Sequence, residues 1–184
     1  MTTELSDSER ERYSAQIAGD LGLEGQLGLK RSRAIVIGAG ATGSAAAAQL
    51  VSSGVGYVAV ADGGTVALRD LAGQTLYYTP DIGQGKADTL AAKLSLLNPE
   101  VQLESYPVEP DSENAAAIVE GHDVALVCTS DAAVARAVSD ACRASDIPAP
   151  SIHDDGPSAV IAGATLGTEV VLMLAGTQTN GARA

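Results

Sequence analysis

Short uncharged runs rich in Val, Ile, Leu and Ala alternate with alanine-rich or amphipathic stretches along most of the chain. Runs of this kind predict strands that are buried in a sheet. The predicted strands of this kind are 34–37, 57–61, 124–128, 147–152 and 170–174. Residues 101–106 alternate between apolar and polar positions, which also predicts a strand. The predicted helices are 41–53, 84–97, 114–120 and 131–145, and residues 63–82 are typical of a loop. Strands alternating with helices predict a three-layer α/β fold with a mostly parallel sheet.

The two ends of the chain differ from this alternating core. Residues 5–18 are polar and predict a short helix, and the glycines at 22, 25 and 28 predict an irregular crossing into the first strand. The polar residues 176–184 predict a frayed tail. Because we find no internal repeat and no linker, residues 1–184 are predicted to form a single domain. Its parts are an N-terminal helical segment 5–28, a core 33–175 and the tail 176–184.

Composition narrows the classes of function. Of the 184 residues 46% are hydrophobic and 18% are charged, which is typical of a globular protein. The net charge of −12 argues against nucleic acid or an anionic membrane as a partner, so an anionic ligand needs a local site. Cys128 and Cys142 form no C-x-x-C pair, which argues against structural zinc and fits a reducing, cytoplasmic compartment.

No membrane or export segment is expected. The first residues are charged and lack the apolar stretch of a signal peptide. Residues 34–61 carry no charge, but glycines and polar side chains interrupt the run. A buried strand–helix–strand unit therefore explains this stretch better than a membrane span.

A G-x-G-x-x-G motif occupies residues 38–43, between a predicted strand and a predicted helix. Gly38 permits the tight turn, Gly40 lets a phosphate approach the backbone, and Gly43 lets the helix pack against the strand. Asp62 ends the next predicted strand, where a carboxylate accepts hydrogen bonds from ribose hydroxyls. The combination predicts a site for an adenine nucleotide. ATP and NAD both remain open, and glycines that serve packing alone are the alternative.

Several more motifs follow one another in the order of a known family. The matching segments are 12–17, 25–30, 38–43, 54–56, 62–74, 82–86, 97–99 and 128–131. On these segments the chain resembles the ThiF/MoeB-type adenylyltransferases, which are relatives of the ubiquitin-activating enzymes. The resemblance implies a Rossmann-like domain that binds ATP with Mg²⁺. It also implies adenylation of the C-terminal carboxylate of a ubiquitin-like or sulfur-carrier protein, and pairing into a homodimer or with a related subunit.

The resemblance also implies the residues of the site. Lys86 stands at the phosphate-contacting lysine of the family and is a predicted catalytic residue. An exposed helix lysine is the alternative for that position. The residues implied to bind the nucleotide are Gly38, Gly40, Ala41, Gly43, Asp62, Asp70, Gln74, Lys86 and Ser130.

Four positions depart from the family pattern. Ala15 and Gly73 replace arginines, Asp70 replaces an asparagine, and Ser130 replaces the metal-linked aspartate. Each charge-assisted hydrogen bond to a phosphate contributes roughly 1.5–3 kcal/mol. The loss of two cations is therefore expected to weaken triphosphate binding or its transition state.

Two neighbouring residues are candidates to compensate. Arg69 is the candidate replacement cation, and Asp131 is the candidate ligand for Mg²⁺; both are predicted catalytic residues. A one-residue shift usually reverses the direction of a side chain, which argues against Asp131. The pair Asp154 and Asp155 after His153 resembles a metal site, but a solvated loop explains it better. Cys128 is interpreted as a small hydrophobic residue rather than a nucleophile.

Three functions stay open at this point. An ATP-dependent adenylyltransferase, which would activate a carboxylate of a carrier protein or of a small molecule, is favoured by the glycine loop, Asp62 and Lys86. A catalytically degenerate relative, acting as a dimer partner or scaffold, is favoured by the missing cations. An NAD-binding oxidoreductase is the third hypothesis, and it has no candidate residues for hydride transfer.

Overall fold

The computed structural model describes residues 4–152, 154, 156 and 158–176. Within this part of the chain, four strands form one parallel sheet in the order β3-β2-β1-β4. The register pairs Ile35 with Ala59 on one side and with Ala125 on the other, so β1 is central. The strands are β1 (Arg33–Ile37), β2 (Tyr57–Ala61), β3 (Gln102–Tyr106) and β4 (Val124–Val127).

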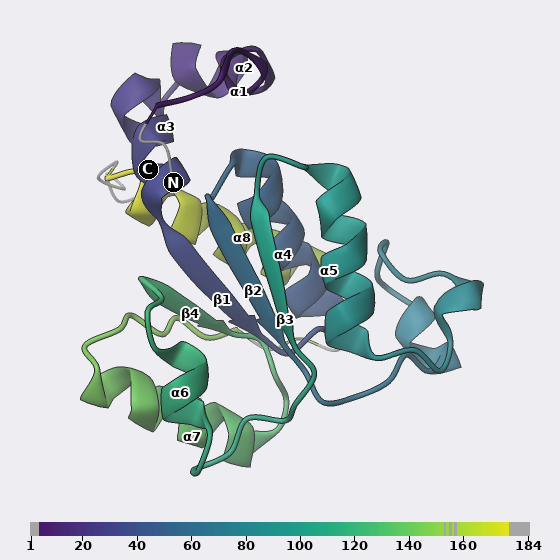
Figure 1. Cartoon of the computed structure of the whole chain (residues 1–184). Helices are drawn as coiled ribbons and strands as arrows, with labels where there is room; N and C mark the ends of the chain where they lie inside the picture. The colour runs from purple at the N-terminus through teal and green to yellow at the C-terminus, as the bar shows by residue number, and fades with distance from the viewer. Residues whose placement is uncertain (1–3, 153, 155, 157, 177–184) are drawn as a thin grey trace, which may run out of the picture.

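Helices cover both faces of this sheet, which confirms the predicted three-layer α/β fold. Figure 1 shows α4, α5 and α8 on one face and α6 and α7 on the other. The α-helices are α1 (Asp7–Arg12), α2 (Ser14–Ala18), α3 (Gly22–Arg31), α4 (Ala41–Ser53), α5 (Lys86–Leu97), α6 (Ala115–Val119), α7 (Ala132–Ala144) and α8 (Ala159–Leu174). The loop predicted over 63–82 contains two 3₁₀ turns, η1 (Leu68–Leu71) and η2 (Thr79–Asp81).

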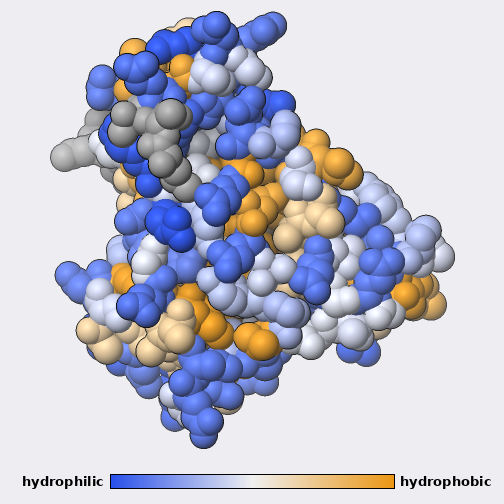
Figure 2. All heavy atoms as spheres, viewed as in Figure 1, coloured by the Kyte–Doolittle hydropathy of each residue, from blue (hydrophilic) through white to orange (hydrophobic). Residues whose placement is uncertain are grey.

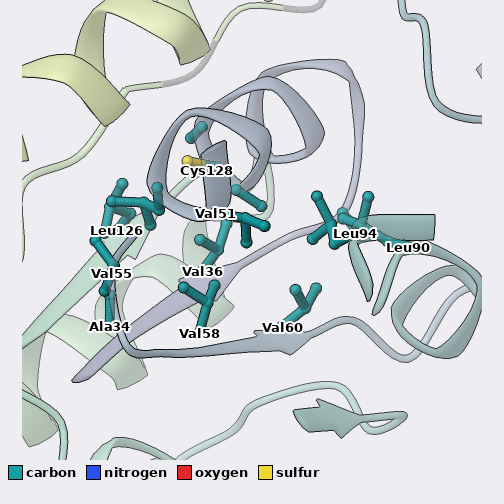
Figure 3. Packing of buried hydrophobic residues seen from close by; sticks show 14 of the residues in the cluster. Ala34, Val36, Val51, Val55, Val58, Val60, Leu90, Leu94, Leu126 and Cys128 are labelled. Carbon is teal, nitrogen blue, oxygen red and sulfur yellow. The ribbon is translucent and has the colours of Figure 1, made fainter. Parts of the chain in front are cut away.

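Successive side chains of a strand point to opposite faces of the sheet, and both faces here are aliphatic. Val36 belongs to the cluster formed with α4, α5 and α8, whereas Ile35 packs with residues of α6 and α7. Figure 3 shows Val36 of β1 next to Val51 of α4, with Leu90 and Leu94 of α5 further along the same layer. This packing holds α4, whose first turn carries the glycine motif, firmly on the sheet.

The surface is mostly hydrophilic on the face drawn in Figure 2, with hydrophobic residues in small groups. Leu96 and Leu97, at the end of α5, are among the exposed large hydrophobic residues. No helix of the described residues is both long enough and apolar enough to cross a bilayer.

The prediction of a strand at 170–174 was wrong, because these residues end the 16-residue helix α8. The buried positions of α8 are Ala159, Gly163, Leu166, Gly167, Val170 and Val171, which recur at helical spacing. The apolar run Val170–Leu174 looks the same locally in a strand and in a buried helix, so periodicity over the longer segment decides.

The strand predicted at 147–152 does not form in this structure. The carbonyl oxygens of Pro148 and Pro150 accept hydrogen bonds from Ala125 and Val127 of β4, each at 3.0 Å. An isolated parallel bridge joins Val127 to Ser151. Because proline has no N–H to donate, the segment runs beside β4 without completing a ladder.

The N-terminal segment also differs from its prediction. The helix expected over 5–18 is divided into α1 and α2 at Tyr13, and the expected irregular crossing is the helix α3. Its glycines permit close packing rather than breaking the helix. A Cβ at Gly28 would lie 3.1 Å from the carbonyl oxygen of Leu174, at the end of α8. The predicted tail lies outside the described residues from residue 177 onward.

Replacing Gly163 by alanine tests the contact between α8 and α4. A Cβ at this position would lie 2.0 Å from the carbonyl oxygen of Thr42, so α8 must move away. Helix propensity alone predicts a gain of about 1 kcal/mol, whereas overpacking costs roughly 1–3 kcal/mol. We expect Gly163→Ala to lower the free energy of unfolding, measured by chemical denaturation. Thr165→Ala, an exposed position on the same helix, is the control, and a Gly163→Ala protein more stable than wild type would contradict the contact.

His122 is expected to make stability pH-dependent. It lies buried beside Tyr57, and burial lowers the pKa of its imidazole. The unfolded chain therefore takes up the proton at higher pH than the folded chain, so stability is lost as pH falls below about 6.5. Unfolding measured between about pH 7.5 and pH 5.5 should show this loss. The loss should shrink in His122→Gln, and an identical slope in both proteins would rule out His122 as its cause.

Candidate functional site

The glycine motif forms a tight turn between β1 and α4. Gly38 has φ +93°, and a Cβ there would lie 2.8 Å from the carbonyl oxygen of Cys128. A Cβ at Gly43 would lie 1.8 Å from the carbonyl oxygen of Gly38. The space around Gly40 is open, since beyond its chain neighbours no described atom lies within 4 Å of where its Cβ would be. Gly38 thus permits the turn and Gly43 the close packing of α4, while the space at Gly40 is open; that a phosphate approaches there stays a prediction.

A cavity of about 600 Å³ opens beside this turn. It lies where the strand order reverses, with β2 on one side of β1 and β4 on the other. Open α/β sheets bind ligands at this position, outside the carboxyl ends of the strands. The lining residues are Gly38, Gly40, Ala41, Thr42, Asp62, Arg69, Asp70, Ala72, Lys86, Glu109, Cys128, Thr129, Ser130 and Asp131.

Asp62 follows β2 and braces the glycine turn. Its Oδ2 accepts a hydrogen bond from the backbone N–H of Ala39 at 2.7 Å, and its Oδ1 accepts one from Gly64 at 2.7 Å. Tyr77 supports the same turn, since its hydroxyl donates a hydrogen bond to the carbonyl oxygen of Ala39 at 2.9 Å. Burial raises the pKa of Tyr77, so its hydroxyl stays protonated and able to donate. The turn is therefore ordered by the chain itself.

Lys86 begins α5 and points into the cavity, where it forms an ion pair. Its Nζ lies 3.0 Å from Oδ1 of Asp70, and both side chains are 16% exposed. The other carboxylate oxygen of Asp70 accepts a hydrogen bond from the N–H of Ala67 at 2.8 Å. The predicted phosphate-contacting cation is thus in the cavity, but it already has an anionic partner.

Arg69, Ser130 and Asp131 also line the cavity. The Oδ1 of Asp131 accepts hydrogen bonds from Ala133 and Val134, so the carboxylate caps the N-terminus of α7. Among the residues that the structure describes, no group of three or more His, Cys, Asp or Glu side chains is placed to hold a metal ion. The role predicted for Asp131 as a ligand for Mg²⁺ therefore stays a prediction.

Gln74 and Gly43 are not among the described residues that line the cavity. The Oε1 of Gln74 accepts hydrogen bonds from Leu76 at 2.8 Å and from Tyr77 at 3.0 Å, which shapes the turn before η2. Ala15 lies on α2, away from the cavity lining. His153 and Asp155 lie outside the described residues.

Sequence reasoning missed Glu109, Thr42 and Tyr77. Glu109 lines the cavity from the segment that follows β3, a position that strand order alone could have indicated. The hydroxyl of Thr42 donates to the carbonyl oxygen of Asp154 at 2.7 Å, a contact between residues far apart in the sequence. Cys128 is 5% exposed, and burial raises the pKa of its thiol to about 12, which agrees with a small hydrophobic residue.

Several motifs outside the cavity form a separate buried cluster. The Nδ2 of Asn98 donates to the hydroxyl of Tyr13 and to the carbonyl oxygen of Val51, both at 2.8 Å. The Nε2 of Gln26 donates to the carbonyl oxygen of Ser53 at 2.9 Å. These bonds join the N-terminal helices to the end of α4. The motifs therefore divide into residues that line the cavity and residues that position α4.

The sequence model of the ThiF family matches residues 13–182. The chain belongs to the ThiF family. The match includes both groups of motifs, those of the cavity and those of the cluster that positions α4.

Two curated relatives carry names that state an activity. The chain is 36% identical over 146 residues to the molybdopterin-synthase adenylyltransferase of Escherichia coli strain K12, which covers 79% of this chain and 59% of that protein. It is 36% identical over 141 residues to the adenylyltransferase and sulfurtransferase MOCS3 of Anopheles gambiae, which covers 76% of this chain and 32% of that protein. The chain thus spans about a third to three fifths of the length of these relatives.

Solved structures share the ThiF-type fold. PaaA has a TM-score of 0.84 at 22% identity, covering 97% of this chain and 69% of that one. E. coli MccB with ATP has a TM-score of 0.82 at 16% identity, covering 94% and 65%. E. coli TcdA, a tRNA N6-threonylcarbamoyladenosine dehydratase, in complex with ATP has a TM-score of 0.75 at 23% identity, covering 80% and 61%.

Replacing Asp62 tests its bracing of the glycine turn. We expect Asp62→Ala to lower the free energy of unfolding by roughly 1–3 kcal/mol, because the N–H groups of Ala39 and Gly64 lose their acceptors. Asp62→Asn keeps one acceptor oxygen, so its free energy of unfolding should lie between those of the wild type and Asp62→Ala. Chemical denaturation measures the series. Equal stability of all three proteins would show that the turn does not need the carboxylate.

Proposed function

We propose that this chain binds ATP in the cavity beside the glycine turn. It then adenylates a carboxylate of a ubiquitin-like or sulfur-carrier protein. The observation that carries the proposal is the convergence of Gly40, Asp62 and Lys86 on one cavity at the switch point of the sheet. The two curated relatives named as adenylyltransferases, and the solved ThiF-type structures with ATP, support it.

The reaction needs positioning and charge neutralisation. An oxygen of the carboxylate attacks the α-phosphorus of ATP, and a new O–P bond forms. The bond from the α-phosphorus to the oxygen shared with the β-phosphate breaks, and pyrophosphate leaves with the electron pair. Here the open backbone at Gly40 and the N-terminus of α4 would receive the phosphates, Asp62 the ribose, and Lys86 the charge on the polyphosphate.

Magnesium bound with the nucleotide would add positive charge on the phosphates, and Asp131 at the cavity wall is the residue proposed to hold it. Arg69, which also lines the cavity, is proposed as a second cation. Pairing with a second copy or a related subunit remains a prediction. The degenerate-scaffold alternative draws no support from the named relatives, which are adenylyltransferases.

ATP–pyrophosphate exchange with candidate carrier proteins tests the proposal. We expect exchange in the wild type and a loss of roughly tenfold or more in Lys86→Ala, because a cation on the polyphosphate is removed. Lys93→Ala is the matched control. Lys93 lies on the same helix but pairs with Asp81 at 2.8 Å, away from the cavity lining.

Two results would contradict the proposal. The absence of exchange together with the absence of ATP binding by calorimetry would favour a scaffold or dimer partner. Tight binding of NAD would favour an oxidoreductase.

A further inference from the structure

The ion pair inside the cavity sets Asp70 apart from the other carboxylates that line it. Its Oδ1 lies 3.0 Å from Nζ of Lys86, and the two side chains are equally shielded, each 16% exposed. The phosphate-facing cation is therefore already neutralised in the folded chain. A ligand phosphate that recruits Lys86 must compete with this carboxylate.

The carboxylate of Asp70 is also held in place from its other side. Its Oδ2 accepts a hydrogen bond from the N–H of Ala67 at 2.8 Å, which closes the turn η1. Asp70 therefore loses that bond if it turns away from the cavity. When a phosphate binds Lys86, a fixed negative charge stays next to it, and repulsion is strongest in such a shielded position.

The other carboxylates of the cavity lining have different partners. Both oxygens of Asp62 accept backbone N–H groups of the glycine turn and of Gly64. Asp131 caps α7, and Glu109 is exposed. Among the described residues that line the cavity, Asp70 is the carboxylate that forms an ion pair with a cation, and that cation is Lys86.

We propose that Asp70 determines which nucleotide charge state the cavity accepts, by disfavouring ligands whose polyphosphate reaches Lys86. ATP without magnesium carries more phosphate charge than AMP and extends further, so it bears most of the penalty. An adenosine monophosphate group is therefore penalised less by Asp70 than the free triphosphate is. This inference rests on the nucleotide binding proposed above and adds the specificity of that site.

Calorimetric dissociation constants for ATP and AMP, each measured with EDTA and with Mg²⁺, test the role of Asp70. In EDTA we expect Asp70→Asn to bind ATP about tenfold or more tightly than wild type, with AMP affinity changed by less than about threefold. The asparagine keeps an oxygen that accepts the N–H of Ala67. Asp88→Asn is the control for net charge, because Asp88 lies two residues after Lys86, contacts Ser105 and is not in the cavity lining.

The outcomes separate this inference from the proposed function. If both proteins bind both nucleotides with the same ATP-to-AMP ratio, Asp70 is not the determinant, and the proposed function stands. If neither protein binds either nucleotide, both proposals are wrong. An ATP affinity raised equally by Asp88→Asn would assign the effect to net charge and overturn the role of Asp70. Thermal unfolding checks the fold of each variant, and Asp70→Ser, which also offers an oxygen to Ala67, replaces Asp70→Asn if that protein does not fold.

Discussion

Close backbone contact around α4 is the constraint on which the rest of this structure depends. A Cβ at Gly43 would strike the carbonyl oxygen of Gly38, and one at Gly163 would strike that of Thr42. At the other end of the helix, Gly54 has φ +87° and leaves no space for a Cβ beside the ring of Tyr13. Sheet, α8 and the N-terminal helices thus all meet α4 at glycines. These contacts fix the position of α4, and the N-terminus of α4 lies at the cavity.

Contacts within the chain also hold the glycine turn beside the cavity. Asp62 accepts the N–H of Ala39, and Tyr77 donates to the carbonyl oxygen of Ala39, so protein groups hold the glycine turn. A turn that protein groups hold in place loses little conformational freedom when a ligand binds. The carboxylate that the sequence predicts to bind ribose therefore has a structural task in the folded chain.

Local sequence could predict the part of the site that is contiguous in the chain. The strand, turn, helix and Asp62 fall within residues 33–62, and their chemistry depends on neighbours in sequence. The Lys86–Asp70 pair could not be predicted in the same way, because it depends on how residues 63–85 fold back. The helix ending at Leu174 was missed for a related reason: its last apolar run fits a strand locally, and the helical spacing of buried positions shows only over the longer segment Ala159–Leu174 that packs on α4.

A short series of hydrogen bonds folds residues 63–85 back on the cavity. This series explains why Lys86 and Asp70 meet. The N–H of Gly64 donates to Asp62, and the carbonyl oxygen of Gly64 accepts the N–H of Lys86 at 2.9 Å. Lys86 then reaches Asp70, within η1. Asp62 and Lys86 are thus linked through one glycine by hydrogen bonds, although residues 63–85 lie between them in the chain. A change in the loop therefore acts on both halves of the site, because the loop connects them.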